Sequence, residues 1–122
     1  MKFTLENSAA LNAVTARAPG EVRIGTRLFR NSVVVSPTAI VEGWQANDAA
    51  RLVEEDVETI LGLGPEIVLL GTGERQVFPT PRVHAAIAAR GVGFEVMDNG
   101  AACRTYNVLL AEGRNVVLAL IL

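Results

Sequence analysis

The sequence predicts an α/β fold: a three-layer sandwich with a mixed central sheet, in which an N-terminal β-meander is followed by the order α-β-α-β-α-β. Short β-branched runs separated by turn residues fill the first third of the chain. After residue 47, segments with helical spacing alternate with short apolar runs. The last run, 116–121, is apolar at every position, which is typical of a strand covered on both faces. We therefore expect this last strand near the centre of the sheet.

The length of 122 residues and the hydrophobic content of 50% predict one domain with a sizeable core. We expect residues 1–20 to form an N-terminal arm and residues 21–122 to form a single α/β domain. The arm shows no clean period and ends at Ala18-Pro19-Gly20, which is a turn signal.

The strands of the meander are predicted from short apolar segments. Val22 and Ile24 precede a break at Gly25, which is a pattern typical of a hairpin. Segment 32–36 is rich in valine and stops before a proline, and segment 39–44 is a further short strand. These antiparallel strands either extend the central sheet or form a small side sheet.

Apolar spacing and capping residues predict the helices of the second part. Asp48 is suited to cap the first helix, and Thr80, followed by a proline, is suited to begin the second. Asp98 or Asn99 caps the third. The expected elements are, in order, a helix over 48–61, a strand over 67–70, a helix from 80 to 91, a strand over 92–97, a helix from 98 to 113 and a strand over 116–121.

Composition excludes several classes of protein. Eleven Lys and Arg against 13 Asp and Glu give a formal net charge of −2, so the basic face of a general nucleic-acid binder is not expected. The single cysteine, Cys103, excludes an intrachain disulfide and fits a reducing compartment. One histidine excludes a multi-histidine metal site. Residues 1–18 are not a convincing signal peptide, and no apolar run is long enough for a transmembrane segment. We therefore expect a cytoplasmic protein with no nucleic-acid partner, no metal and no cofactor.

The turn Gly71-Thr72-Gly73 follows the predicted strand over 67–70. Open α/β sheets bind ligands at the carboxyl ends of their strands, and glycine lets the backbone approach a ligand closely. A dinucleotide-binding fingerprint requires a third glycine where this chain has Gln76, which disfavours that class. The segment is either a purely structural turn or a loop that binds a small ligand.

Polar side chains also follow the next predicted strand. Asp98 and Asn99 reach the same sheet edge as the glycine turn if the two strands run parallel, and Thr105 and Asn107 follow on the helix. These side chains either line a polar cleft or serve as helix caps and backbone partners. No pair of carboxylates suited to acid–base catalysis is evident, so we expect no catalytic residue.

Three other features have both a structural and a functional interpretation. Cys103 lies near the start of the third helix, where a thiolate is stabilised, but nothing in the spacing brings it to the one available base, His84. We therefore expect Cys103 to be a small core residue or an inert surface residue, not a nucleophile. The acidic residues of 54–58 are either a solvated helix face or a docking surface for a protein. Trp44 is either a core residue or, if exposed, a sign of an interface.

Several segments together resemble a known family, and the most specific are Thr-Tyr-Asn-Val-Leu at 105–109 and Glu-Gly-Arg at 112–114. The other matching segments are 67–73, 79–81, 93–98 and 102–104. The sequence resembles, over roughly residues 20–121, a family of small bacterial, archaeal and mitochondrial proteins described as a domain of unknown function. That family includes mitochondrial complex I assembly factor 3 and the adipogenesis-associated domain protein of animals.

The resemblance implies a three-layer fold with a mixed sheet and no established catalytic activity. It also implies a ligand-binding pocket built from shared residues, namely Gly71, Thr72, Gly73, Asp98, Thr105 and Asn107. By analogy with assembly factor 3, we expect a non-enzymatic protein-interaction or assembly factor of bacterial type with an unidentified protein partner. The alternative is a small-molecule-binding protein or an unrecognised enzyme with a cleft at the glycine turn. A homo-oligomer formed through the arm and the strand edges of the meander is a further possibility.

Overall fold

The computed structural model describes residues 11–122, and the first ten residues lie outside it. The predicted arm over 1–20 therefore lies partly outside the described residues. In its described part, Val14–Ala18 forms strand β1 and pairs with the next strand. Within residues 11–122, the helices are too short or too polar to cross a membrane.

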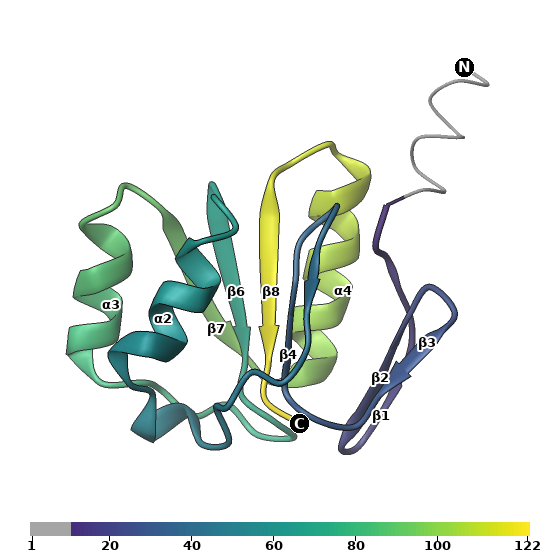
Figure 1. The fold of residues 1–122 in the computed structure, drawn as a ribbon, viewed down its shortest axis with the longest axis horizontal. Coiled ribbons are helices and arrows are strands. Elements are labelled where there is room, and N and C mark those ends of the chain that lie inside the picture. The colour runs from purple at the N-terminus through teal and green to yellow at the C-terminus, as the bar shows by residue number, and fades with distance from the viewer. Residues whose placement is uncertain (1–10) are drawn as a thin grey trace.

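The central sheet is mixed, as predicted (Figure 1). Its strands are β4 (Val33–Val35), β5 (Ile40–Val41), β6 (Ile67–Gly71), β7 (Gly93–Met97) and β8 (Val116–Leu120), arranged in the order β5-β4-β8-β6-β7. Strand β6 is parallel to both β7 and β8, whereas β4 is antiparallel to β5 and β8. The central position expected for the last strand is confirmed.

The first strands form a separate side sheet. Strands β1, β2 (Glu21–Ile24) and β3 (Arg27–Phe29) pair antiparallel in chain order. The predicted break at Gly25 is the hairpin turn between β2 and β3, and this glycine has a φ of 59°, a conformation that suits glycine.

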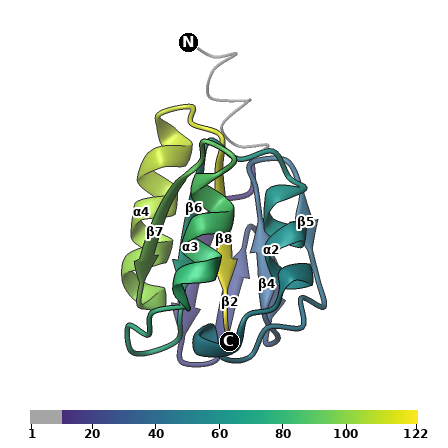
Figure 2. The same ribbon diagram turned by 90° about the vertical axis from the view of Figure 1, so that its left-hand side faces the viewer.

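Helices and the side sheet cover the two faces of the central sheet. Helices α2 (Glu54–Leu61) and α3 (Pro81–Ala88) lie side by side on one face, and α4 (Asn99–Ala111) and the side sheet lie on the other (Figures 1 and 2). The predicted three layers and the order of elements are confirmed.

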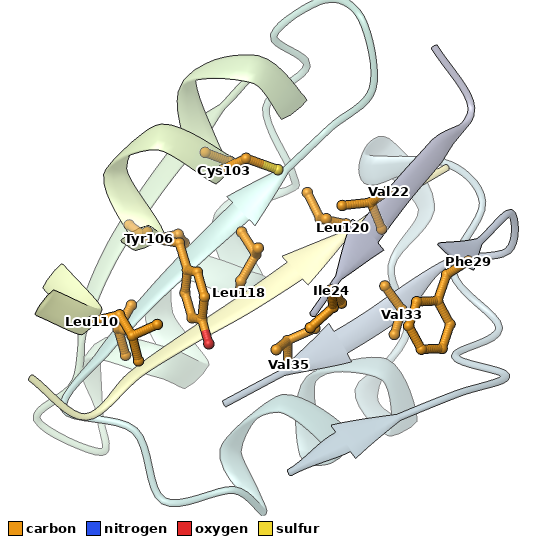
Figure 3. Packing of buried hydrophobic residues seen from close by; sticks show 13 residues of the cluster. Val22, Ile24, Phe29, Val33, Val35, Cys103, Tyr106, Leu110, Leu118 and Leu120 are labelled. Atoms are coloured by element: carbon orange, nitrogen blue, oxygen red, sulfur yellow. The ribbon is translucent and has the colours of Figure 1, made fainter. Parts of the chain in front are cut away.

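Strand β8 divides its side chains between these two faces. Leu118 and Leu120 pack into the cluster formed with α4 and the side sheet (Figure 3). Val117 and Ala119 pack into the opposite cluster, which includes Ile60 of α2. Because successive residues of a strand point to opposite faces, a strand buried on both sides must be apolar throughout.

The predicted helix that begins at Asp48 is wrong as a single helix. The Asp48 side chain caps only a 3₁₀ turn, η1 (Ala49–Arg51), and Leu52 then adopts an extended conformation with ψ of 137°. The Asp56 carboxylate accepts a hydrogen bond from the backbone N–H of Val53 at 2.9 Å, and α2 begins at the following residue. This carboxylate cap fixes a second helix start inside a segment whose apolar spacing is continuous.

Candidate functional site

The carboxyl ends of β6 and β7 lie next to each other, with Gly71 paired to Met97. The chain leaves β6 toward α3 on one face of the sheet and leaves β7 toward α4 on the other face. Ligands of open α/β sheets bind at such a point, where connections to neighbouring strands diverge. The prediction that the glycine turn and the Asp98-Asn99 pair reach one edge is confirmed.

The side chain of Asn99 fills this position. Its Oδ1 accepts a hydrogen bond from the backbone N–H of Gly73 at 3.0 Å, and its Nδ2 donates to the carbonyl of Ile121 at 2.9 Å. The backbone N–H of Asn99 donates to the carbonyl of Gly73 at 2.8 Å. Only 3% of Asn99 is exposed, so this amide ties the ends of three strands together beneath the surface.

Gly71 provides the space that this amide occupies. A Cβ at position 71 would overlap the Oδ1 of Asn99, and it would lie 2.6 Å from Cδ2 of Leu120 and 3.3 Å from Cβ of Ala102. The absence of a side chain at Gly71 therefore leaves room for side chains of the protein itself, those of Asn99, Leu120 and Ala102.

The Thr72 hydroxyl stabilises the turn through hydrogen bonds within the protein. Its hydroxyl donates to the carbonyl of Arg75 at 2.6 Å and accepts from the backbone N–H of Val77 at 3.0 Å. Its own backbone N–H donates to the carbonyl of Met97 at 2.9 Å. The residue is 8% exposed, so the hydroxyl shapes the loop that follows β6 and is turned away from solvent.

The remaining predicted residues follow along α4. Asp98 caps the helix, with Oδ1 accepting from the backbone N–H of Ala101 at 2.9 Å, and Thr105 lies 3.6 Å from the sulfur of Met97. Asn107 lies about 14 Å further along the helix axis than Asp98, since an α-helix rises about 1.5 Å per residue. The structure therefore brings Gly71, Thr72, Gly73 and Asp98 together, and places Asn107 elsewhere.

Asn107 holds the side sheet against α4. Its Oδ1 accepts from the backbone N–H of Val14 at 3.0 Å, and its Nδ2 donates to the Val14 carbonyl at 2.8 Å. The hydroxyl of Tyr106 donates to the carbonyl of Asn12 at 2.6 Å in the same region. These side chains replace strand partners for a segment that precedes them by more than 90 residues.

Cys103 and His84 lie on opposite faces of the central sheet. Cys103 belongs to the buried cluster beneath α4, which is the core alternative of the prediction, and burial raises the pKa of its thiol to about 11 despite the nearby charges of Arg17 and Arg104. His84 is exposed on α3 and contacts the ring of Phe94 edge-on, with centroids 4.9 Å apart. The thiol is therefore protonated at neutral pH and has no imidazole beside it.

Asn99 is the central residue of this edge, and the sequence indicated it as a helix cap or as part of a polar cleft, not as a link between strand ends. Its partners, Gly73 and Ile121, are 26 and 22 residues away, so no local pattern connects them. The one available signal was the pair of glycines, Gly71 and Gly73, at the end of β6. This strand runs parallel to β7, which precedes Asn99.

Two surface cavities lie away from the glycine turn. One of about 520 Å³ lies between the β3–β4 connection and residues 42–47, and another of about 390 Å³ lies between α2 and α3. Trp44 borders the first but is only 5% exposed, and its Nε1 donates to the carbonyl of Asp56 at 3.2 Å. Trp44 is therefore a core residue. Within residues 11–122, His, Cys, Asp and Glu side chains form no group of three or more suited to a metal ion.

Comparisons with known proteins agree with the resemblance found in the sequence. The family model described as "Protein of unknown function (DUF498/DUF598)" matches residues 14–121. The 13 kDa major membrane protein of Francisella tularensis is 34% identical over 89 residues, which cover 72% of this chain and 72% of that protein. A crystal structure of a protein from Bordetella parapertussis has a TM-score of 0.85 and 40% identity, covering 91% of this chain and 95% of that one.

A bovine relative aligns with nearly the whole chain. NADH dehydrogenase (ubiquinone) 1 alpha subcomplex assembly factor 3 of Bos taurus is 34% identical over 118 residues, which are 95% of this chain. The aligned part is 63% of the bovine protein, so this chain spans less than two thirds of that relative's length.

Proposed function

Because the chain belongs to the DUF498/DUF598 family of proteins of unknown function, we propose that it acts as a non-enzymatic protein-interaction factor, an assembly factor like the mitochondrial relative. The observation that carries this proposal is the alignment of 95% of the chain with assembly factor 3. The part shared by the two proteins covers 95% of this chain, so a shared mode of protein binding is expected to reside in it.

Two features of the described residues support the proposal. The polar side chains at the carboxyl edge of β6 and β7 bond to the chain itself, as a structural role requires. Large apolar side chains are instead exposed on the side sheet, on α4 and on loops, where a protein partner can cover them. They are Leu28, Val53, Phe78 and Val108, of which Phe78 is 62% exposed.

The test is affinity purification of the tagged protein after gentle extraction, with quantitative mass spectrometry. Phe78→Ser and Val108→Ser are suitable variants because both side chains are more than half exposed, at 62% and 56%, and lie on different elements. Wild-type protein is expected to recover a defined partner, and one of the two variants to lose it. Recovery of the tagged protein alone would contradict the proposal.

The complex I part of the proposal has its own test. In a host that contains respiratory complex I, removal of the protein is expected to lower the amount of mature complex I in native electrophoresis and to accumulate partial assemblies. Re-expression is expected to reverse both effects. An unchanged complex I level, together with recovery of another partner, would assign the interaction to a different assembly.

A second candidate is small-molecule binding at the turn of Gly71, Thr72 and Gly73, with Asp98, Thr105 and Asn107 as further residues. The position of the turn where β6 and β7 diverge favours it. A ligand there has to displace the internal hydrogen bonds of Asn99 and Thr72. A thermal-shift screen tests this, since a ligand at 100 times its Kd adds about 2.7 kcal/mol of stability. A hit abolished by Gly73→Val would support it, and a flat screen would count against it.

A further inference from the structure

The groove between α2 and α3 has an apolar floor. Val57 of α2 and Val83 of α3 are buried side by side in one cluster and line its base. Ala86 lines the α3 side and is exposed, and Val53 lines the α2 end with 53% of its surface exposed. These four side chains form an apolar strip along the groove, which is open to solvent on its outer side.

The two rims of this groove carry opposite charges. Glu54 and Glu58 line the rim formed by α2, a helix whose charged residues are all acidic. Arg82 lines the rim formed by α3, which has no acidic residue. Arg82 lies across the groove from the two glutamates. Within residues 11–122, however, none of these three side chains takes part in an ion pair.

We propose that this groove is a self-association surface that binds a second copy of the chain. A two-fold axis running along the groove lays α2 of one copy over α3 of the other. Glu58 then faces Arg82 of the partner subunit, and the same pair is repeated on the other side of the axis. The apolar strips face each other between these two sets of charges.

Charge complementarity favours a second copy of the chain as the molecule that binds in this groove. A two-fold interface requires a surface that complements itself, and one acidic rim beside one basic rim meets that requirement. A partner helix of a single charge sign would match one rim and oppose the other. Each of the two helices has eight residues and is about 12 Å long. The contact is accordingly small, and we expect a reversible dimer rather than an obligate one.

Sedimentation equilibrium over a concentration series tests the proposal. Wild-type protein is expected to show a monomer–dimer equilibrium. Glu58→Arg and Arg82→Glu are each expected to weaken dimerisation at least about tenfold, because like charges then oppose each other twice in the symmetric contact. An equimolar mixture of the two variants is expected to restore a dimer made of one copy of each.

A matched pair on α3 tests the apolar strip. Ala86→Lys places a charge in the groove and is expected to abolish the dimer, whereas Ala85→Lys is the control because Ala85 is also exposed but does not line the groove. A protein that stays monomeric at every concentration overturns the proposal, as does a dimer insensitive to these charges. A monomeric result leaves the proposed assembly function untouched, since that function rests on the relatives and concerns a different partner.

Discussion

The polar side chains of Asn99 and Thr72 at the carboxyl edge of β6 and β7 are buried and bond within the chain, whereas those at the groove between α2 and α3 are exposed to solvent. At the edge, the amide of Asn99 and the hydroxyl of Thr72 donate and accept within the chain, and both residues are buried. In the groove, the charges of Glu58 and Arg82 lie at the surface without an ion-pair partner among the described residues.

The difference follows from the cost of burial. A buried amide without a partner costs about 1–3 kcal/mol, so the fold has to satisfy Asn99 internally. A charged side chain at the surface is solvated by water and remains available to another molecule. Polar residues at the usual ligand position of an α/β sheet therefore stabilise this fold, and the surface suited to binding lies where two helices leave an apolar strip uncovered.

Substitution at Gly71 is expected to break the edge with the largest effect. Gly71→Ala puts a Cβ against the Asn99 amide and 2.6 Å from Leu120, so the free energy of unfolding is expected to fall by about 3 kcal/mol. Gly93→Ala is the control, because its nearest neighbours, atoms of Ile67, lie at 3.4 Å or more, and we expect a change within about 0.5 kcal/mol. Urea denaturation measures both. Equal effects would mean that the close fit at the end of β6 is not what holds this edge.

Removal of the central amide is expected to have the next largest effect. Asn99→Ala leaves the N–H of Gly73 and the carbonyl of Ile121 without their side-chain partner, and we expect a loss of about 2 kcal/mol. Asn31→Ala is the matched control, since Asn31 is exposed. Thermal unfolding of both variants measures the difference. An Asn99 variant as stable as the control would show that water replaces the amide without cost.

The layered fold was predictable from the sequence because its determinants are local. The uniformly apolar run of β8 indicated a strand buried on both faces, and the glycine at 25 indicated the hairpin of the side sheet. The break between η1 and α2 was not predictable from spacing, because it depends on which backbone N–H the Asp56 carboxylate caps.

The site was predictable only in part. The parallel arrangement of β6 and β7 brought the glycine turn and Asp98 together as expected. The role of Asn99 depends on the space left by Gly71, and the role of Asn107 depends on a strand 93 residues earlier. Such contacts are set by tertiary packing, which local sequence patterns do not encode.

The buried face of α4 is expected to make stability depend on alkaline pH. Burial raises the pKa of Cys103 from its ordinary value of 9.0 to about 11, so the unfolded chain releases this proton first. The contribution of this thiol to the free energy of unfolding is therefore constant below pH 9 and falls between pH 9 and about 11, by at most about 2.7 kcal/mol. Cys103→Ala is expected to lessen that fall in urea titrations. An equal fall in both proteins would assign it to other groups.

Substitution of Val53 is expected to change stability least. It tests separately what this residue contributes to folding and what it contributes to self-association. This residue occupies the N-cap of α2 with extended backbone and no side-chain cap, although serine and threonine are preferred there. Val53→Ser is expected to raise the free energy of unfolding by about 0.5 kcal/mol through a new cap, and to weaken self-association by removing apolar surface from the groove. Val53→Ala, which removes apolar surface without adding a cap, is expected to weaken association with no gain in stability. Unfolding and sedimentation of the three proteins measure both quantities. If the serine variant is more stable and associates as the wild type does, the Val53 side chain contributes nothing to self-association. If it is more stable and monomeric, valine at this N-cap favours self-association at the expense of helix stability.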